Sequence, residues 1–171
     1  MSSATGAGAP AGGRFWRSYE LSVNALAVVL FAAMVVVTAA GVFFRYVLNA
    51  ALPWAEEADR YLFIWLSFVG ASITMRYQAH IAVDILVRSF SPAARDWAAL
   101  LSHGCILVFV GTVFCATERV IEVTSVTRTT ATDIPMSWVY LAVPVGCTLI
   151  AIEVLRLASR TVRRMAAGAT P

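Results

Sequence analysis

The sequence predicts an all-α integral membrane protein, a bundle of four transmembrane helices with both termini in the cytoplasm. Three observations lead to this fold class. Of the 171 residues, 60% are hydrophobic and 13% are charged, and the mean hydropathy is +0.76, whereas a soluble domain has about 25% charged residues. The charges are clustered, so that four uncharged runs separate them. The thirteen basic residues, all arginines, are also distributed unevenly along the chain.

The uncharged runs predict where the chain crosses the membrane. They cover residues 21–44, 61–75, 97–117 and 134–152, and a bilayer core of roughly 30 Å needs about 20 apolar residues. The second run is short. It can still span because Asp59, Arg60 and Arg76, which flank it, can extend their charged groups to the two interfaces.

These runs define one predicted membrane domain, residues 15–165. Its spans are expected at about 21–45, 54–76, 97–120 and 134–155. The first span is expected to be an uncleaved anchor, since no small-residue cleavage site follows it closely. Segment 1–14 is predicted to be a disordered cytoplasmic tail, and 166–171 a frayed C-terminal tail.

The arginines predict the orientation. Nine of them lie in the N-terminal segment, in the connection between the second and third spans, and in the C-terminal segment, while four lie in the other two connections. Because cytoplasmic segments are enriched in Lys and Arg, both termini are predicted to be cytoplasmic. The net charge of +3 follows from this asymmetry. No basic soluble surface of the kind that binds nucleic acid is predicted.

The second helix is predicted to begin at Pro53, which suits the first position of a helix. Glu56 and Glu57 then lie in the first turn, where the helix dipole favours anions. Glu56 and Arg60 are spaced as an i,i+4 ion pair.

The same helical pattern continues to about Val87, which is longer than a bilayer requires. We therefore expect a long polar or interfacial extension of the second helix. It carries a charged stripe at four-residue spacing beside an apolar one. The stripe consists of Arg76, His80, Asp84 and Arg88.

The third and fourth helices have their own boundary signals. Ser91 and Pro92 predict a turn before the third helix, which is expected to continue towards Val123. Asp133 is expected to cap the fourth helix, and Pro144 with Gly146 to kink it.

Two other functions are compatible with parts of the sequence. His80 and His103, the two histidines, could hold a haem between helices in an electron-transfer protein. The simpler interpretation is that His103 forms a hydrogen bond between helices.

A small autonomous exporter would need a carboxylate in the middle of a span, and every Asp and Glu is predicted to lie at a helix end. Cys105, Cys115 and Cys147 are interpreted as packing residues. The chain is therefore expected to be non-catalytic and without a cofactor.

Several motifs resemble one family over nearly the whole chain after the N-terminal tail. They are "FFRY" at the end of the first span, "PWAEEADRYLFIWLSFVGAS" in the second, "RYQAHIAVDIL" after it, and "IPMSWVYLAVPVGC" in the fourth. The chain resembles the small membrane subunit (Q-type, small permease) of tripartite ATP-independent periplasmic (TRAP) transporters, with the third span matched by position only. The matching residues are Arg45, Trp54, Glu56, Glu57, Arg60, Trp65, Gly70, His80, Asp84, Pro135, Trp138, Tyr140, Pro144 and Gly146.

The resemblance implies a function. In such transporters a periplasmic binding protein delivers a substrate, usually an organic acid, to a large multi-span subunit of the bacterial inner membrane. The large subunit moves the substrate inward with a sodium gradient and is expected to bind the sodium. The small subunit braces it.

The resemblance also suggests roles for single residues. Trp54, Glu56, Glu57 and Arg60 are candidates for docking the binding protein or for periplasmic anchoring. Arg76, His80, Asp84 and Arg88 are candidates for a cytoplasmic interface. Simple anchoring in lipid headgroups is the alternative for both groups. The structural candidates are Arg45, Trp65, Gly70, Pro135, Trp138, Pro144 and Gly146.

Overall fold

The computed structural model describes residues 11–78, 92–124, 127–129, 131 and 133–166. These residues form helices and no strand, apart from one β-bridge between Arg128 and Pro135. The all-α prediction is confirmed. The helices are α1 (Ala11–Tyr46), α2 (Pro53–Gln78), α4 (Pro92–Thr124), the short α5 (Ser137–Tyr140) and α6 (Ala142–Ala166).

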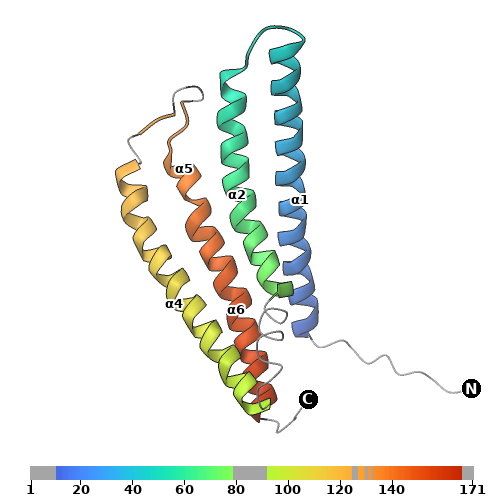
Figure 1. The fold of residues 1–171 in the computed structure, drawn as a ribbon, viewed down its shortest axis with the longest axis vertical. Helices are drawn as coiled ribbons and strands as arrows, with labels where there is room; N and C mark the ends of the chain where they lie inside the picture. Colours follow the sequence, from blue (N-terminus) through green and yellow to red (C-terminus); the bar gives the residue numbers. More distant parts are fainter. Residues whose placement is uncertain (1–10, 79–91, 125–126, 130, 132, 167–171) are drawn as a thin grey trace, which may run out of the picture.

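The four long helices lie in one layer, in the order α1, α2, α6, α4 (Figure 1). α2 packs against α1 and α6, and α6 packs against α2 and α4. Within the described residues α1 and α4 make no contact, so the predicted bundle is open rather than closed. The layer can stay open because lipid or another membrane protein can cover apolar faces, so helix association in a bilayer needs no closed core.

Three of these helical segments are long and apolar enough to cross a membrane, judged by length and composition over the described residues. They are Phe15–Tyr46, Asp96–Thr124 and Ser137–Ala166, which joins α5 and α6. α2 does not meet the same criterion. It lies between two helices that do, α1 and α6.

Helix ends differ from the predicted spans at several places. α1 begins at Ala11, inside the segment predicted to be disordered, because extending an existing helix by a turn costs little compared with starting one. α2 begins at Pro53 as predicted. Its expected extension to Val87 falls in residues 79–91, which lie outside the described residues. α6 continues past 155 to Ala166.

The fourth predicted helix is interrupted at Leu141, between α5 and α6. The interruption lies one turn before Pro144, which has no N–H to donate to the carbonyl of Tyr140. Asp133 does not cap this helix. It has a left-handed backbone (φ 52°) and its carboxylate accepts a hydrogen bond from Arg128 Nη1 (3.3 Å), while the residue before α5, Met136, forms no side-chain cap.

The tightest packing joins α2 to α6. A Cβ atom added at Gly146 of α6 would lie 2.5 Å from the Cβ of Phe68 of α2, so only glycine fits there. Val69 and Ser72 of α2 and Val154 of α6 are almost completely buried in the same region. By contrast, a Cβ added at Gly70 would meet nothing within 4 Å.

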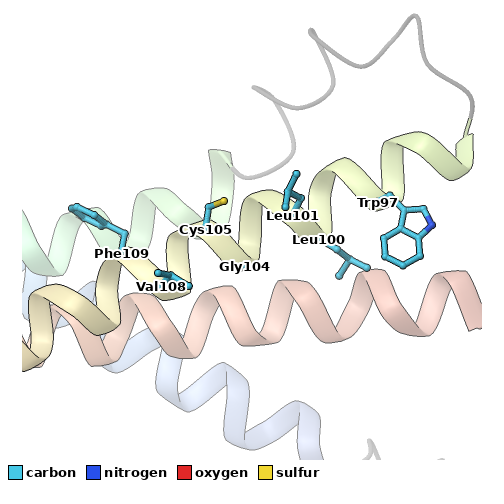
Figure 2. A pocket seen from close by; sticks show the side chains of 7 residues that line it. All are labelled: Trp97, Leu100, Leu101, Gly104, Cys105, Val108 and Phe109. Carbon is cyan, nitrogen blue, oxygen red and sulfur yellow. The ribbon is translucent and has the colours of Figure 1, made fainter.

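The faces of the edge helices are apolar and exposed. α1 exposes large side chains such as Val28, Phe31 and Val36. α4 carries an apolar groove of about 790 Å³, whose lining is shown in Figure 2. It is lined by Trp97, Leu100, Leu101, Gly104, Cys105, Val108 and Phe109. These surfaces are suited to lipid chains or to the apolar helices of another membrane protein.

Candidate functional site: charged contacts at the two ends of the layer

A fully buried carboxylate lies in the middle of α6. Glu153 has 0% exposure. Its Oε1 accepts hydrogen bonds from Nε (3.1 Å) and Nη2 (2.7 Å) of Arg76, near the end of α2. The Arg76 side chain is only 12% exposed. This ion pair therefore joins α2 to α6 inside the layer.

Arg156 extends the pair to α1. It lies one turn after Glu153, with its Nη1 3.8 Å from Glu153 Oε2. The same guanidinium donates a hydrogen bond to Glu20 of α1. The aromatic rings of α1 also contact the arginines: Arg156 Cζ lies 4.4 Å from the ring centre of Trp16, and Arg76 Cζ lies 6.0 Å from that of Tyr19. We call Glu20, Arg76, Glu153 and Arg156 the charge network.

The charge network changes one conclusion drawn from the sequence. The prediction that every acid lies at a helix end is wrong for Glu153, because α6 continues well past it to Ala166. A buried charge is tolerated when it is paired and hydrogen-bonded, and here two arginines provide that pairing. The sequence contained a signal for it, the i,i+3 spacing of Glu153 and Arg156 directly after a long apolar run.

A second set of contacts joins α1 to α2 at the opposite end. Arg45, at the end of α1, forms an ion pair with Glu56 in the first turn of α2. The predicted ion pair of Glu56 with Arg60 is therefore wrong, because Glu56 pairs with Arg45 instead. Further into the layer, two turns before Arg45 in α1 and one turn after Glu56 in α2, Thr38 Oγ1 donates to Asp59 Oδ2 (2.9 Å). A cavity of about 220 Å³ lies between these helices, lined in part by these four side chains.

Glu57 connects α2 to the segment that precedes α5. Its Oε1 accepts a hydrogen bond from the backbone N–H of Ala131 (3.1 Å). Trp54 is 43% exposed and Arg60 is exposed. Of the four residues predicted to face the periplasm, Glu56 and Glu57 therefore contact neighbouring segments. Trp54 and Arg60 present their side chains outward.

The other predicted residues lie apart from one another. Trp65 is half-buried in α2, Trp138 of α5 is 62% exposed, and Pro135 forms the β-bridge with Arg128. His103 is buried in α4.

The predicted haem and cytoplasmic-interface residues can be placed only in part. Of the cytoplasmic stripe, Arg76 contacts Glu153. His80, Asp84 and Arg88 lie outside the described residues. The hypothetical haem pair of His80 and His103 therefore stays a prediction.

The chain matches one family over most of its length. The family model described as "Tripartite ATP-independent periplasmic transporters, DctQ component" matches residues 34–165. This range covers most of the layer, including Arg45, Glu56, Arg76, Glu153 and Arg156.

Three known proteins show the extent of the similarity. The C4-dicarboxylate TRAP transporter small permease protein DctQ of Vibrio cholerae is 36% identical over 77 residues, which are 45% of this chain and 33% of the relative. The protein of the same name from Rhodobacter capsulatus is 29% identical over 109 residues, 63% of this chain and 48% of the relative. The isethionate TRAP transporter permease protein DctMQ of Oleidesulfovibrio alaskensis is 27% identical over 123 residues, 71% of this chain and 19% of the relative. The chain thus spans a third to about half of the two small permeases.

Proposed function

Because the chain belongs to the DctQ family of tripartite ATP-independent periplasmic transporters, we propose that it is the small membrane subunit of such a transporter. Its role is to brace a large transport subunit, without catalysis of its own. The observation that carries this proposal is the family match over 34–165, which covers a layer of long helices held together by charged contacts.

The geometry suits a brace. The charge network joins α1, α2 and α6 where α2 ends, halfway along α6, and the Arg45–Glu56 pair joins α1 to α2 near the opposite end of the layer. The outer helices α1 and α4 keep their apolar surfaces exposed. A rigid layer with apolar faces can hold a larger membrane protein in position, because helix association in lipid depends on close packing between preformed helices.

We further propose that α2 is a fourth span and that both termini are cytoplasmic in the bacterial inner membrane. Its 26 residues correspond to roughly 39 Å, enough to cross a bilayer core. It packs between α1 and α6, two segments that are apolar enough to span. The start of α1 and the end of α6 lie at the same end of the layer (Figure 1), with Arg17, Arg76 and Arg156, as the positive-inside rule favours.

The proposed partners are a large multi-span permease and a periplasmic substrate-binding protein. In the isethionate relative the similar segment forms 19% of a longer permease, which supports an association between this segment and a larger permease part. The names of the Vibrio and Rhodobacter relatives refer to C4-dicarboxylates. For this chain we propose an organic acid as the substrate, taken up with sodium that binds the large subunit.

Deletion and co-purification test the brace. An affinity tag on this chain should retain the large subunit in mild detergent, and deletion of the chain should abolish sodium-driven uptake in proteoliposomes that contain the large subunit and the binding protein. Uptake at the full rate without this chain would contradict the proposal. Uptake by vesicles that contain only this chain would favour the autonomous exporter instead.

The outward-facing residues Trp54 and Arg60 are our candidates for docking the binding protein. Both are exposed at the start of α2, the end that the proposed topology assigns to the periplasm. Glu56 and Glu57 support this surface through their contacts with Arg45 and Ala131. Anchoring in lipid headgroups is the competing role for Trp54 and Arg60.

The double change Trp54→Ala/Arg60→Gln should raise the binding-protein concentration that gives half-maximal uptake by several-fold. The part of this effect that comes from Arg60 should shrink at high salt, because exposed charges are screened beyond about 8 Å at physiological ionic strength. Arg119→Gln is the matched control, an exposed arginine at the same end of the layer on α4. An unchanged half-maximal concentration in the double variant would leave only the anchoring role.

A further inference from the structure

A basic pocket lies between the first turns of α1 and the last turns of α6. Its volume is about 450 Å³. α1 contributes Trp16, and α6 contributes two apolar residues, Ile152 and Leu155, together with Ser159 and three arginines. The arginines are Arg156, Arg160 and Arg163, whose spacing of four and three residues places them on one face of the helix.

The three arginines are not equivalent. Arg156 is engaged by Glu20 and Glu153 and stacks on the Trp16 ring, so its charge is compensated within the protein. Arg160 and Arg163 are exposed, and neither forms an ion pair within the described residues. The pocket therefore offers two guanidinium groups that can bind an anion, beside a third whose partners are Glu20, Glu153 and Trp16.

The pocket also has a direction along α6. Ile152 and Leu155 lie towards the middle of the helix, and Leu155 is 56% exposed. Arg160 and Arg163 lie towards its end. A ligand that fills this pocket has an anionic group at one end and an apolar part at the other. A free phosphate ion would use the arginines and leave the apolar wall uncovered.

We propose that this pocket binds an anionic phospholipid. The phosphate accepts hydrogen bonds from Arg160 and Arg163, and the upper part of an acyl chain packs on Leu155 and Ile152. Trp16 forms the wall contributed by α1, as tryptophan does at membrane interfaces. Basic pockets between membrane helices suit anionic headgroups in this way. The lipid would bridge α1 and α6 beside the charge network.

Native mass spectrometry of the full chain in mild detergent tests the site. We expect saturable binding of dioleoylphosphatidylglycerol and much weaker binding of dioleoylphosphatidylcholine, which has the same acyl chains. A guanidinium near an anionic lipid contributes about fivefold in affinity, so Arg160→Gln/Arg163→Gln should weaken binding of phosphatidylglycerol by about thirtyfold. A large excess of inorganic phosphate should not displace the lipid.

The matched control is Arg17→Gln/Arg164→Gln. It removes the same charge at the same end of the layer, from exposed residues that do not line the pocket, and it should leave binding nearly unchanged. Equal losses of lipid affinity in the two double variants, or equal affinity for both lipids, would contradict the proposal that this pocket is the binding site. Displacement of the bound lipid by inorganic phosphate would show that the pocket recognises the phosphate alone and not a phospholipid. Loss of the large subunit on co-purification, with lipid binding intact, would assign the pocket to a protein partner.

Because the double variant could fold poorly, helix content by circular dichroism accompanies each measurement. The second variant, Leu155→Gln, alters only the apolar wall and keeps all three arginines. It should weaken the binding of phosphatidylglycerol, because the acyl chain loses its apolar contact while the arginines keep theirs with the phosphate. Full retention of lipid by a folded Leu155→Gln protein would contradict the proposed acyl-chain contact.

Discussion

Glu153 illustrates how a single buried charge can fix the relation of three helices. Its side chain is 1% exposed and its carboxylate contacts Arg76 of α2 and Arg156 of α6. Arg156 in turn contacts Glu20 of α1. Such a group specifies one arrangement, since sliding any of these helices would leave a charge buried without its partner.

Loss of the Glu153 charge should therefore be costly. We expect Glu153→Gln to lower the free energy of unfolding by about 3–5 kcal/mol, because it leaves Arg76, whose side chain is only 12% exposed, without its counter-charge. The measurement is unfolding by sodium dodecyl sulfate, followed by circular dichroism. The double variant Arg76→Gln/Glu153→Gln should be less destabilised than the sum of its single changes, since contacting residues couple by about 0.5–3 kcal/mol.

The Arg45–Glu56 pair provides the comparison. Its side chains are 50% and 67% exposed, so water already solvates both charges. Arg45→Gln/Glu56→Gln should leave the free energy of unfolding nearly unchanged. If Arg45→Gln/Glu56→Gln lost as much free energy of unfolding as Glu153→Gln, the buried charge network would be no more stabilising than an exposed ion pair. Strictly additive effects of the changes at Arg76 and Glu153 would show that these two residues do not interact.

At the scale of elements, the contact between α2 and α6 depends on a glycine. Gly146 allows Phe68 to approach so closely that an added Cβ would lie 2.5 Å from the Phe68 Cβ. Close approach at small residues is a common way to pack helices in membranes. The interruption between α5 and α6 at Leu141 lies five residues before Gly146.

Gly146→Ala should separate α2 from α6 or force Phe68 to move. Overpacking of this kind costs about 1–3 kcal/mol, again measured by detergent unfolding. Gly70→Ala is the matched control on the facing helix, where nothing lies within 4 Å. It should be neutral or slightly stabilising, because alanine favours a helix more than glycine does. A neutral Gly146→Ala would show that the helices pack less closely than described.

At the scale of the whole molecule, the chain is a flat layer with two charged ends. The ends differ in their arginines: those towards the end that holds the start of α1 include Arg17, Arg76, Arg156, Arg160, Arg163 and Arg164, and those towards the other end are Arg45, Arg60, Arg119 and Arg128 (Figure 1). This difference is the basis of the proposed topology.

Cysteine labelling tests the topology. In a background without the native cysteines, Ala51→Cys lies in the exposed connection between α1 and α2, and Arg164→Cys is exposed near the end of α6. An impermeant maleimide should label residue 51 in whole cells, while residue 164 should react only after the cells are opened. The reverse pattern would overturn the orientation, and labelling of both in whole cells would contradict the shared cytoplasmic side of the termini.

The sequence by itself determined the helical class, most helix positions and the family. Uncharged runs are long enough to show which segments are helical and apolar, Pro53 restricts its own backbone and so sets the start of α2, and the unequal arginines are visible in a simple count. All of these signals reside in consecutive residues. The motifs around Arg45, Trp54 and Pro135 could likewise be compared with a family without knowing which residues touch.

Only the tertiary structure decided how the helices meet. Arg76 and Glu153 are 77 residues apart, and no local pattern says that α2 lies beside α6 rather than α4. The role of Gly146 also depends on a distant segment. The sequence predicts that it kinks the fourth helix, whereas the structure shows that it allows the close approach of Phe68. The open layer was also not predictable, because apolar side chains in a membrane protein can be covered by neighbouring helices or by lipid with similar energy. Which of the two covers a given face depends on shape and on paired charges between distant segments.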